Sequence, residues 1–205
     1  MNLPNKITIS RIFFIPLLMI FTIPIPESIV NAGILQFIQP QMIAFNQFIA
    51  SFGGYVAAAI FVIASSTDAV DGYIARKNNL VTNFGKFLDP IADKLIVAAA
   101  LMALVQSGEL NAWAAIIIIA REFIISGFRL VAVGDGVVIA ASKLGKLKTI
   151  TQDVAIVATL LNNFPLSLLT DFPLDDYLML IAVILTIYSL YDYLKKNSHV
   201  IDTNK

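Results

Sequence analysis

Between residues 68 and 93 the sequence reads Asp68-Ala-Val-Asp71-Gly72-Tyr-Ile-Ala75-Arg76, then eight further residues, then Gly85-Lys-Phe-Leu-Asp89-Pro-Ile-Ala-Asp93. The aspartates are three residues apart in the first segment and four apart in the second. If both segments are helical, each pair projects from one helix face, because residues at these spacings are neighbours on a helix surface. Two such faces would bring together four carboxylates that repel one another in a low-dielectric site. Divalent cations relieve this repulsion, and oxygen ligands favour Mg²⁺, Mn²⁺ or Ca²⁺ over zinc.

The composition around these aspartates is that of a membrane protein. The chain has 205 residues, of which 58% are hydrophobic and 14% are charged. A soluble domain is roughly 45–50% apolar, and about a quarter of its residues are charged. We therefore predict an all-α integral membrane protein that forms one domain over residues 1–205. The absence of cysteine excludes disulfides and thiolate metal sites.

Six segments approach the roughly 20 apolar residues that a membrane-spanning helix needs. We place them at Ile7–Ile25, Ile49–Ile74, Phe87–Val105, Ala112–Val133, Ile150–Leu169 and Tyr177–Leu194. Residues 31–48 are too short and too polar to span, and Pro40 interrupts them. This segment is predicted to form one or two interfacial helices.

Lysine and arginine lie almost entirely on one side of the predicted spans. The other side consists of residues 26–48, 106–111 and 170–176, which contain acidic residues and neither Lys nor Arg. The positive-inside rule therefore places both termini and the aspartate-bearing loop in the cytoplasm. The expected fold is a six-transmembrane-helix bundle with a polar active-site cavity that opens to the cytoplasmic side of the cell membrane.

The motif D-x-x-D-G-x-x-A-R, eight residues, G-x-x-x-D-x-x-x-D resembles the signature of the CDP-alcohol phosphatidyltransferases. The fixed positions of that signature are matched by Asp68, Asp71, Gly72, Ala75, Arg76, Gly85, Asp89 and Asp93. Eight specified residues at fixed spacing make the resemblance specific.

The resemblance implies a role for each motif residue. Two ions, Mg²⁺ or Mn²⁺, would be held by Asp68, Asp71, Asp89 and Asp93. Asp93 would also be the general base that removes a proton from the attacking alcohol. The cytidine and diphosphate of the donor would lie near Asp68, Gly72, Ala75, Arg76 and Gly85.

A second set of charged residues predicts where the acceptor binds. Arg121 and Arg129 are eight residues apart in an apolar helix, so they share a face. Glu122 is adjacent to Arg121 and is not expected to share that face. Lys146 and Lys148 follow the helix and could close over the same place. Several cations facing an aspartate and metal site indicate an anionic acceptor, such as a phosphorylated alcohol. The alternatives are that Arg121 pairs with a carboxylate and that the lysines bind anionic lipids.

Three further segments resemble the bacterial phosphatidylglycerophosphate synthase branch of the family. These are Asn2–Arg11, Ala120–Glu122 and Gly145–Gln152. The branch implies transfer of a phosphatidyl group from CDP-diacylglycerol to glycerol 3-phosphate, which gives phosphatidylglycerophosphate and CMP. It also places Thr8 and Arg11 near the acceptor headgroup, and the alternative for these two residues is a helix N-cap and an interfacial arginine. The family implies a homodimer among membrane lipids.

Other functions stay open at the level of sequence. The same chemistry could use inositol phosphate, serine or phosphatidylglycerol as the acceptor. A membrane prenyltransferase also binds diphosphate through Asp-rich helices, but it would carry two distant Asp motifs. A divalent-cation transporter would use the carboxylates as an ion path and would leave the arginines unexplained. No nucleic-acid partner is expected.

Overall fold

The computed structural model describes residues 3–77, 83–134, 139 and 142–197, without the side chains of residues 3–9, 68–77 and 83–90. Within these ranges all regular secondary structure is helical, as predicted. The helices form two compact units. The first unit is Met1–Glu109 with Leu160–Asn162, and the second is Leu110–Thr159 with Asn163–Lys205.

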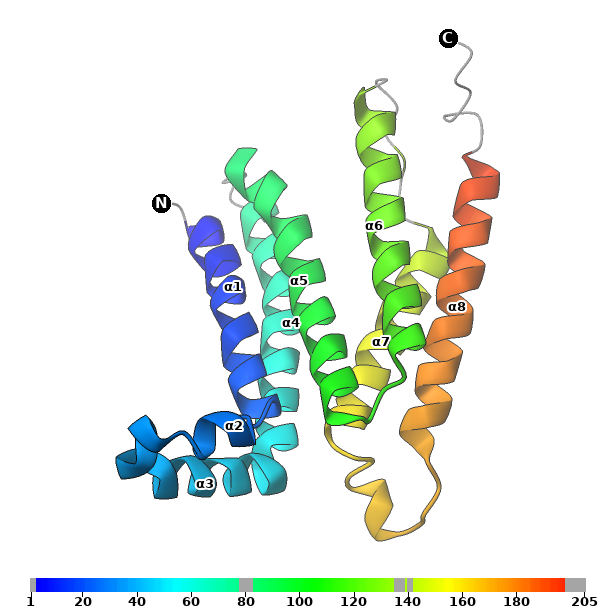
Figure 1. Cartoon of the computed structure of the whole chain (residues 1–205). Helices are drawn as coiled ribbons and strands as arrows, with labels where there is room; N and C mark the ends of the chain where they lie inside the picture. Colours follow the sequence, from blue (N-terminus) through cyan, green and yellow to red (C-terminus); the bar gives the residue numbers. More distant parts are fainter. Residues whose placement is uncertain (1–2, 78–82, 135–138, 140–141, 198–205) are drawn as a thin grey trace. The chain divides into compact units, whose positions relative to one another are not determined.

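Three long helices run side by side in the first unit (Figure 1). They are α1 (Leu3–Thr22), α4 (Gly54–Lys77) and α5 (Asn83–Ser107). Helix α1 packs against both of the others, and α4 also contacts α5. Alanines such as Ala64 and Ala92 are fully buried, and small side chains let membrane helices approach closely. The two helices that carry the aspartate pairs are therefore neighbours.

The predicted interfacial segment is helical and lies across the ends of α1 and α4 (Figure 1). It follows the short helix α2 (Glu27–Val30) and consists of η1 (Gly33–Ile38) and α3 (Gln39–Phe48). A π-helical turn, η2 (Ile49–Gly53), then leads into α4. Pro40 lies in the first turn of α3, where its missing N–H has no helical partner to lose. The proline thus begins a helix.

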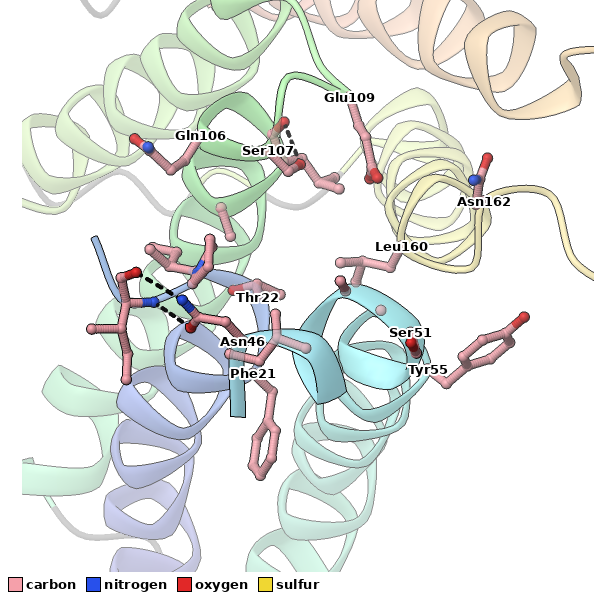
Figure 2. Close-up of a pocket in the computed structure, with 18 of the residues that line it drawn as sticks. Phe21, Thr22, Asn46, Ser51, Tyr55, Gln106, Ser107, Glu109, Leu160 and Asn162 are labelled. Carbon is pink, nitrogen blue, oxygen red and sulfur yellow. Dashed lines mark hydrogen bonds between the residues drawn. The ribbon is translucent and has the colours of Figure 1, made fainter. Parts of the chain in front are cut away.

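Specific contacts fix this segment to the end of α1 and to the residues that follow it. The Asn46 side chain accepts a hydrogen bond from the Ile25 N–H at 2.8 Å and donates one to the Ile25 carbonyl at 2.9 Å (Figure 2). The Phe21 ring packs edge-on against the Phe48 ring, with centroids 6.3 Å apart. At Gly53 a Cβ would lie 2.3 Å from the Phe21 carbonyl oxygen, so only glycine allows this approach. The turn from α3 into α4 is therefore held at several points.

The second unit contains α6 (Ala112–Gly134), α8 (Leu174–Lys196) and α7 (Lys143–Leu160) up to Thr159. Helices α6 and α8 pack against each other. One face of α8 is buried and is partly polar. Its residues are Met179, Ala182, Thr186, Ser189 and Tyr193.

The predicted span Ile150–Leu169 is wrong at its C-terminal end, because α7 ends at Leu160. Asn162 and Asn163 adopt positive φ of 48° and 58°, a conformation that Asn tolerates better than most residues. The N–H of Asn163 donates to the Ala158 carbonyl at 3.0 Å, which closes the helix. At the other end, the Ser142 hydroxyl accepts a hydrogen bond from the Gly145 N–H at 3.0 Å and caps α7.

Two helical stretches within the described residues are long and apolar enough to cross a membrane. They are Gly33–Thr67 and Leu174–Lys196, and a shorter apolar helix covers Ser10–Thr22. The first stretch turns at η2 (Figure 1), so only its α4 part runs alongside α1 and α5.

Candidate active site

Both aspartate pairs lie on helices, which is the condition under which their spacing brings each pair to one face. Asp68 and Asp71 belong to α4, whereas Asp89 and Asp93 belong to α5. The Asp93 side chain is exposed. Most of the other predicted residues of this site have side chains outside the described part of the chain. They are Asp68, Asp71, Gly72, Ala75, Arg76, Gly85 and Asp89, together with Thr8 on α1.

The backbone arrangement fits a hard divalent cation. The metal prediction requires helical aspartate pairs on neighbouring helices, and α4 and α5 meet that condition. A donor set made only of carboxylate oxygens suits Mg²⁺ or Mn²⁺. Among the side chains that the structure describes, no group of three or more His, Cys, Asp or Glu residues could hold a metal. That search covers Asp93 but not its three predicted partners.

Figure 2 shows a cavity of about 750 Å³ that includes Gln106 and Ser107, at the end of α5. The aspartates are at the other end of that helix. The cavity is lined only by residues of the first unit, including Asn46, Ser51, Gln106 and Glu109. Asp93 and Gln106 are thirteen residues apart on one helix, which corresponds to about 20 Å along its axis. This cavity is therefore not the predicted active-site cavity.

In the second unit, two arginines of α6 point to α8. Arg121 is 8% exposed, and its Nε donates a hydrogen bond to the Ser189 hydroxyl at 3.2 Å. The Nε of Arg129 donates to the Tyr193 hydroxyl at 3.4 Å, and its guanidinium lies 5.7 Å from the centre of the Tyr193 ring. The prediction that Arg121 and Arg129 share one helix face is confirmed.

Glu122 joins Arg121 to a lysine of α7. The Lys148 side chain is fully buried and its ammonium donates a hydrogen bond to the Glu122 carboxylate. The same carboxylate accepts a hydrogen bond from Arg121 Nη1 at 3.2 Å. Arg121 therefore pairs with a carboxylate, which was the alternative for this residue, and the two side chains meet without sharing a helix face because long side chains on adjacent residues can bend toward each other. The only sequence signal for Glu122 was a carboxylate within an apolar helix, which needs a partner.

The remaining predicted acceptor residues are placed differently. Lys146 is exposed on α7, and Arg11 is fully buried on α1, in the first unit. Gly145 lies beside Arg121, since a Cβ on Gly145 would be 3.7 Å from Arg121 Nη2. The first turn of α7 therefore lies beside Arg121.

The buried cluster is suited to bind an anion. Arg121 and Lys148 share one carboxylate, so the three side chains together carry one net positive charge. Guanidinium and ammonium groups form strong, charge-assisted hydrogen bonds with phosphate oxygens. Such bonds are less screened at a buried site than at the surface.

Comparison with known proteins identifies the family of this chain. Residues 1–188 match the family model described as CDP-alcohol phosphatidyltransferase. The chain belongs to this family. The match spans both units and confirms the resemblance seen in the aspartate motif.

Relatives of this CDP-alcohol phosphatidyltransferase carry more specific names. A protein of Bacillus subtilis (strain 168) named CDP-diacylglycerol–glycerol-3-phosphate 3-phosphatidyltransferase is 47% identical, over 99% of this chain and 98% of its own length. A protein of the same name from Rickettsia typhi is 36% identical, over 95% of this chain and 96% of its own. A probable phosphatidylglycerophosphate synthase of Mycobacterium tuberculosis (strain ATCC 25618 / H37Rv) is 41% identical, over 69% of this chain and 65% of its own.

Proposed function

We propose that this protein transfers the phosphatidyl group of CDP-diacylglycerol to glycerol 3-phosphate, giving phosphatidylglycerophosphate and CMP. The observation that carries the proposal is the 47% identity, over nearly the whole of both chains, to the Bacillus subtilis enzyme of that name. The buried pair of Arg121 and Lys148 supports an acceptor that bears a phosphate. Serine as the acceptor would leave this cationic cluster without a phosphate to bind.

The proposed membrane arrangement has six spans, α1 and α4 to α8, with both termini and the aspartates on the cytoplasmic side. The one-sided distribution of lysine and arginine supports this orientation. The proposed single domain covers residues 1–205, and the family match over residues 1–188 supports it because that match crosses the boundary between the two units. The proposed assembly is a homodimer in the cell membrane.

The four aspartates are the proposed ligands of two divalent ions, Mg²⁺ or Mn²⁺. When bound, such ions neutralise the charge of the diphosphate and of the departing CMP. Gly72, Ala75 and Gly85 remove side-chain bulk where the cytidine and diphosphate would approach the helices. Arg76 would donate hydrogen bonds to phosphate oxygens, and Asp68 would also reach the donor.

In the proposed reaction, a hydroxyl oxygen of glycerol 3-phosphate attacks the phosphorus nearest the diacylglycerol. The bond from that phosphorus to the oxygen of CMP breaks, and CMP leaves with the electron pair. Asp93 accepts the proton of the attacking hydroxyl as the general base. A carboxylate is a weak base, so correct positioning of the two substrates must contribute much of the rate.

Arg121 and Lys148 would hold the phosphate of the acceptor, with Glu122 as their partner when no acceptor is bound. Arg129 and Lys146 would add positive charge near the same site, and Thr8 and Arg11 are further candidates for the headgroup. A cation-transport function would leave this buried cationic cluster without a role.

The reaction is tested by the release of CMP from purified protein in detergent, with CDP-diacylglycerol and Mg²⁺ or Mn²⁺. We expect release that depends on glycerol 3-phosphate and stops on chelation of the metal. Inositol phosphate, serine and phosphatidylglycerol are supplied in parallel as competing acceptors. Release with one of these alone would change the acceptor, and no release with any of them from folded protein would refute the transferase proposal.

The segment of η1 and α3 is proposed to lie in the membrane interface on the side opposite the aspartates. Ile34 and Phe37 of η1 are 90% and 77% exposed, next to apolar helices that would face lipid. Gln47 is an exposed polar residue on α3. Large apolar side chains at such a position favour lipid contact over water.

Tryptophan fluorescence can test this arrangement, because Trp113 is the only tryptophan of the chain. In a Trp113→Phe background, the Phe37→Trp reporter should be quenched by lipids brominated near the headgroup. The matched Gln47→Trp reporter should instead be quenched by aqueous iodide. Equal quenching of both reporters by iodide would contradict an interfacial position for η1.

A further inference from the structure

One helix face of the second unit has polar residues that the family motifs do not include. On α8 this face contains Thr186, Ser189 and Tyr193. Ser189 and Tyr193 contact the two arginines of α6, so the face points to α6. Thr186 is on the same face, one turn before Ser189, and is fully buried.

Thr186 differs from other helical threonines of the protein. The hydroxyls of five described threonines donate a hydrogen bond to the carbonyl four residues earlier, which satisfies them within their own helix. These five are Thr22, Thr67, Thr149, Thr151 and Thr159. The Thr186 hydroxyl has no hydrogen-bond partner among the described residues. Buried polar groups are nearly always paired, so a partnerless hydroxyl in an interior indicates a missing partner.

The position of Thr186 links it to the anion-binding cluster. The Ser189 hydroxyl accepts from Arg121 and donates to the Thr186 carbonyl at 3.1 Å. On α7, Gln152 is one turn beyond Lys148, and its buried Oε1 also has no hydrogen-bond partner in the described structure. Helix α7 runs in the opposite direction to α6 and α8 (Figure 1), so Thr186 and Gln152 are displaced from the cations in the same direction. Thr186 thus lies about one helical turn, ~5 Å along α8, from the residue that contacts Arg121, and Gln152 lies about one turn along α7 from Lys148.

We propose that the Thr186 hydroxyl binds the non-reacting hydroxyl of the phosphorylated polyol whose phosphate is held by Arg121 and Lys148. The inference rests on the proposed function and makes α8 part of the acceptor site. A neutral hydroxyl can both donate to and accept from a substrate hydroxyl. The length of one helical turn is also close to the distance between the phosphate and the middle, non-reacting hydroxyl of glycerol 3-phosphate. Thr186 would therefore distinguish acceptors by their hydroxyls, whereas the cations would recognise the phosphate.

Two acceptors and three variants test this role. The acceptors are glycerol 3-phosphate and 3-hydroxypropyl phosphate, which lacks the middle hydroxyl. For Thr186→Val, of nearly the same shape, we expect the KM for glycerol 3-phosphate to rise about five- to tenfold, as for the loss of one hydrogen bond. Its KM for 3-hydroxypropyl phosphate should equal that of the unaltered protein. Thr186→Ser should restore the KM for glycerol 3-phosphate.

Thr159→Val is the matched control, because Thr159 is buried on α7 but bonds to its own helix. It should change neither KM. If Thr186→Val raised the KM for both acceptors equally, or for neither, Thr186 would have no role in recognising the hydroxyl. If the unaltered protein released no CMP with either acceptor, the proposed function itself would fail, and this inference with it.

Discussion

Replacement of Asp93 by Asn is expected to reduce acceptor-dependent CMP release by about 10²–10⁴-fold, the usual contribution of a general base. Asn has nearly the same shape as Asp but cannot accept the proton of the attacking hydroxyl. Asp93 lies on α5 with an exposed side chain, so the substitution should leave folding intact. The measurement is CMP release at saturating CDP-diacylglycerol and glycerol 3-phosphate, with thermal unfolding as a check on the fold.

The same substitution also removes a proposed metal ligand, and a metal titration separates the two roles. If Asp93 acts mainly as the base, raising the Mn²⁺ concentration will not restore the rate. Full recovery at high Mn²⁺ would assign Asp93 to metal binding alone. Asp176→Asn is the control, because Asp176 is exposed in the first turn of α8 and should show activity within twofold of the unaltered protein. Activity of Asp93→Asn close to that of the control would exclude Asp93 as the base.

The helical architecture was readable from the sequence, because hydropathy and residue spacing are local signals. Each of the six predicted spans overlaps a long helix, although α7 covers only the first part of the fifth, and the predicted interfacial segment divides before Pro40. The eight-residue spacing of Arg121 and Arg129 correctly placed both on one face. These successes depend on the helical period, which tertiary contacts do not change.

The sequence analysis failed where a feature depends on backbone conformation or on residues far away in the chain. The end of α7 at Leu160 depends on the positive φ of Asn162 and Asn163, which hydropathy does not report. The role of Glu122 depends on Lys148, 26 residues later in the chain. In the sequence, Ser189 is one small residue of an apolar span. Its role becomes visible only through its contact with Arg121 in the structure.

Replacement of Lys148 by Met is expected to raise the KM for glycerol 3-phosphate about 10- to 100-fold, with a much smaller effect on kcat. The Lys148 ammonium is fully buried, and a hydrogen bond between charged groups contributes about 1.5–3 kcal/mol. Without it, the Glu122 carboxylate neutralises Arg121 and the site loses its net positive charge. The KM for CDP-diacylglycerol should stay within twofold, because that substrate is assigned to the aspartate helices. Initial rates of CMP release over a range of each substrate measure both constants.

The comparison of the two KM values decides between a binding and a structural role for Lys148. A structural lysine would, when replaced, change both values or only lower the unfolding temperature. Lys196→Met is the matched control, because Lys196 pairs with Asp192 on the exposed surface of α8, where ion pairs contribute little. It should leave both KM values unchanged. An unchanged KM for glycerol 3-phosphate in Lys148→Met would mean that the Glu122 ion pair serves folding. The acceptor phosphate would then have to be bound by other cations.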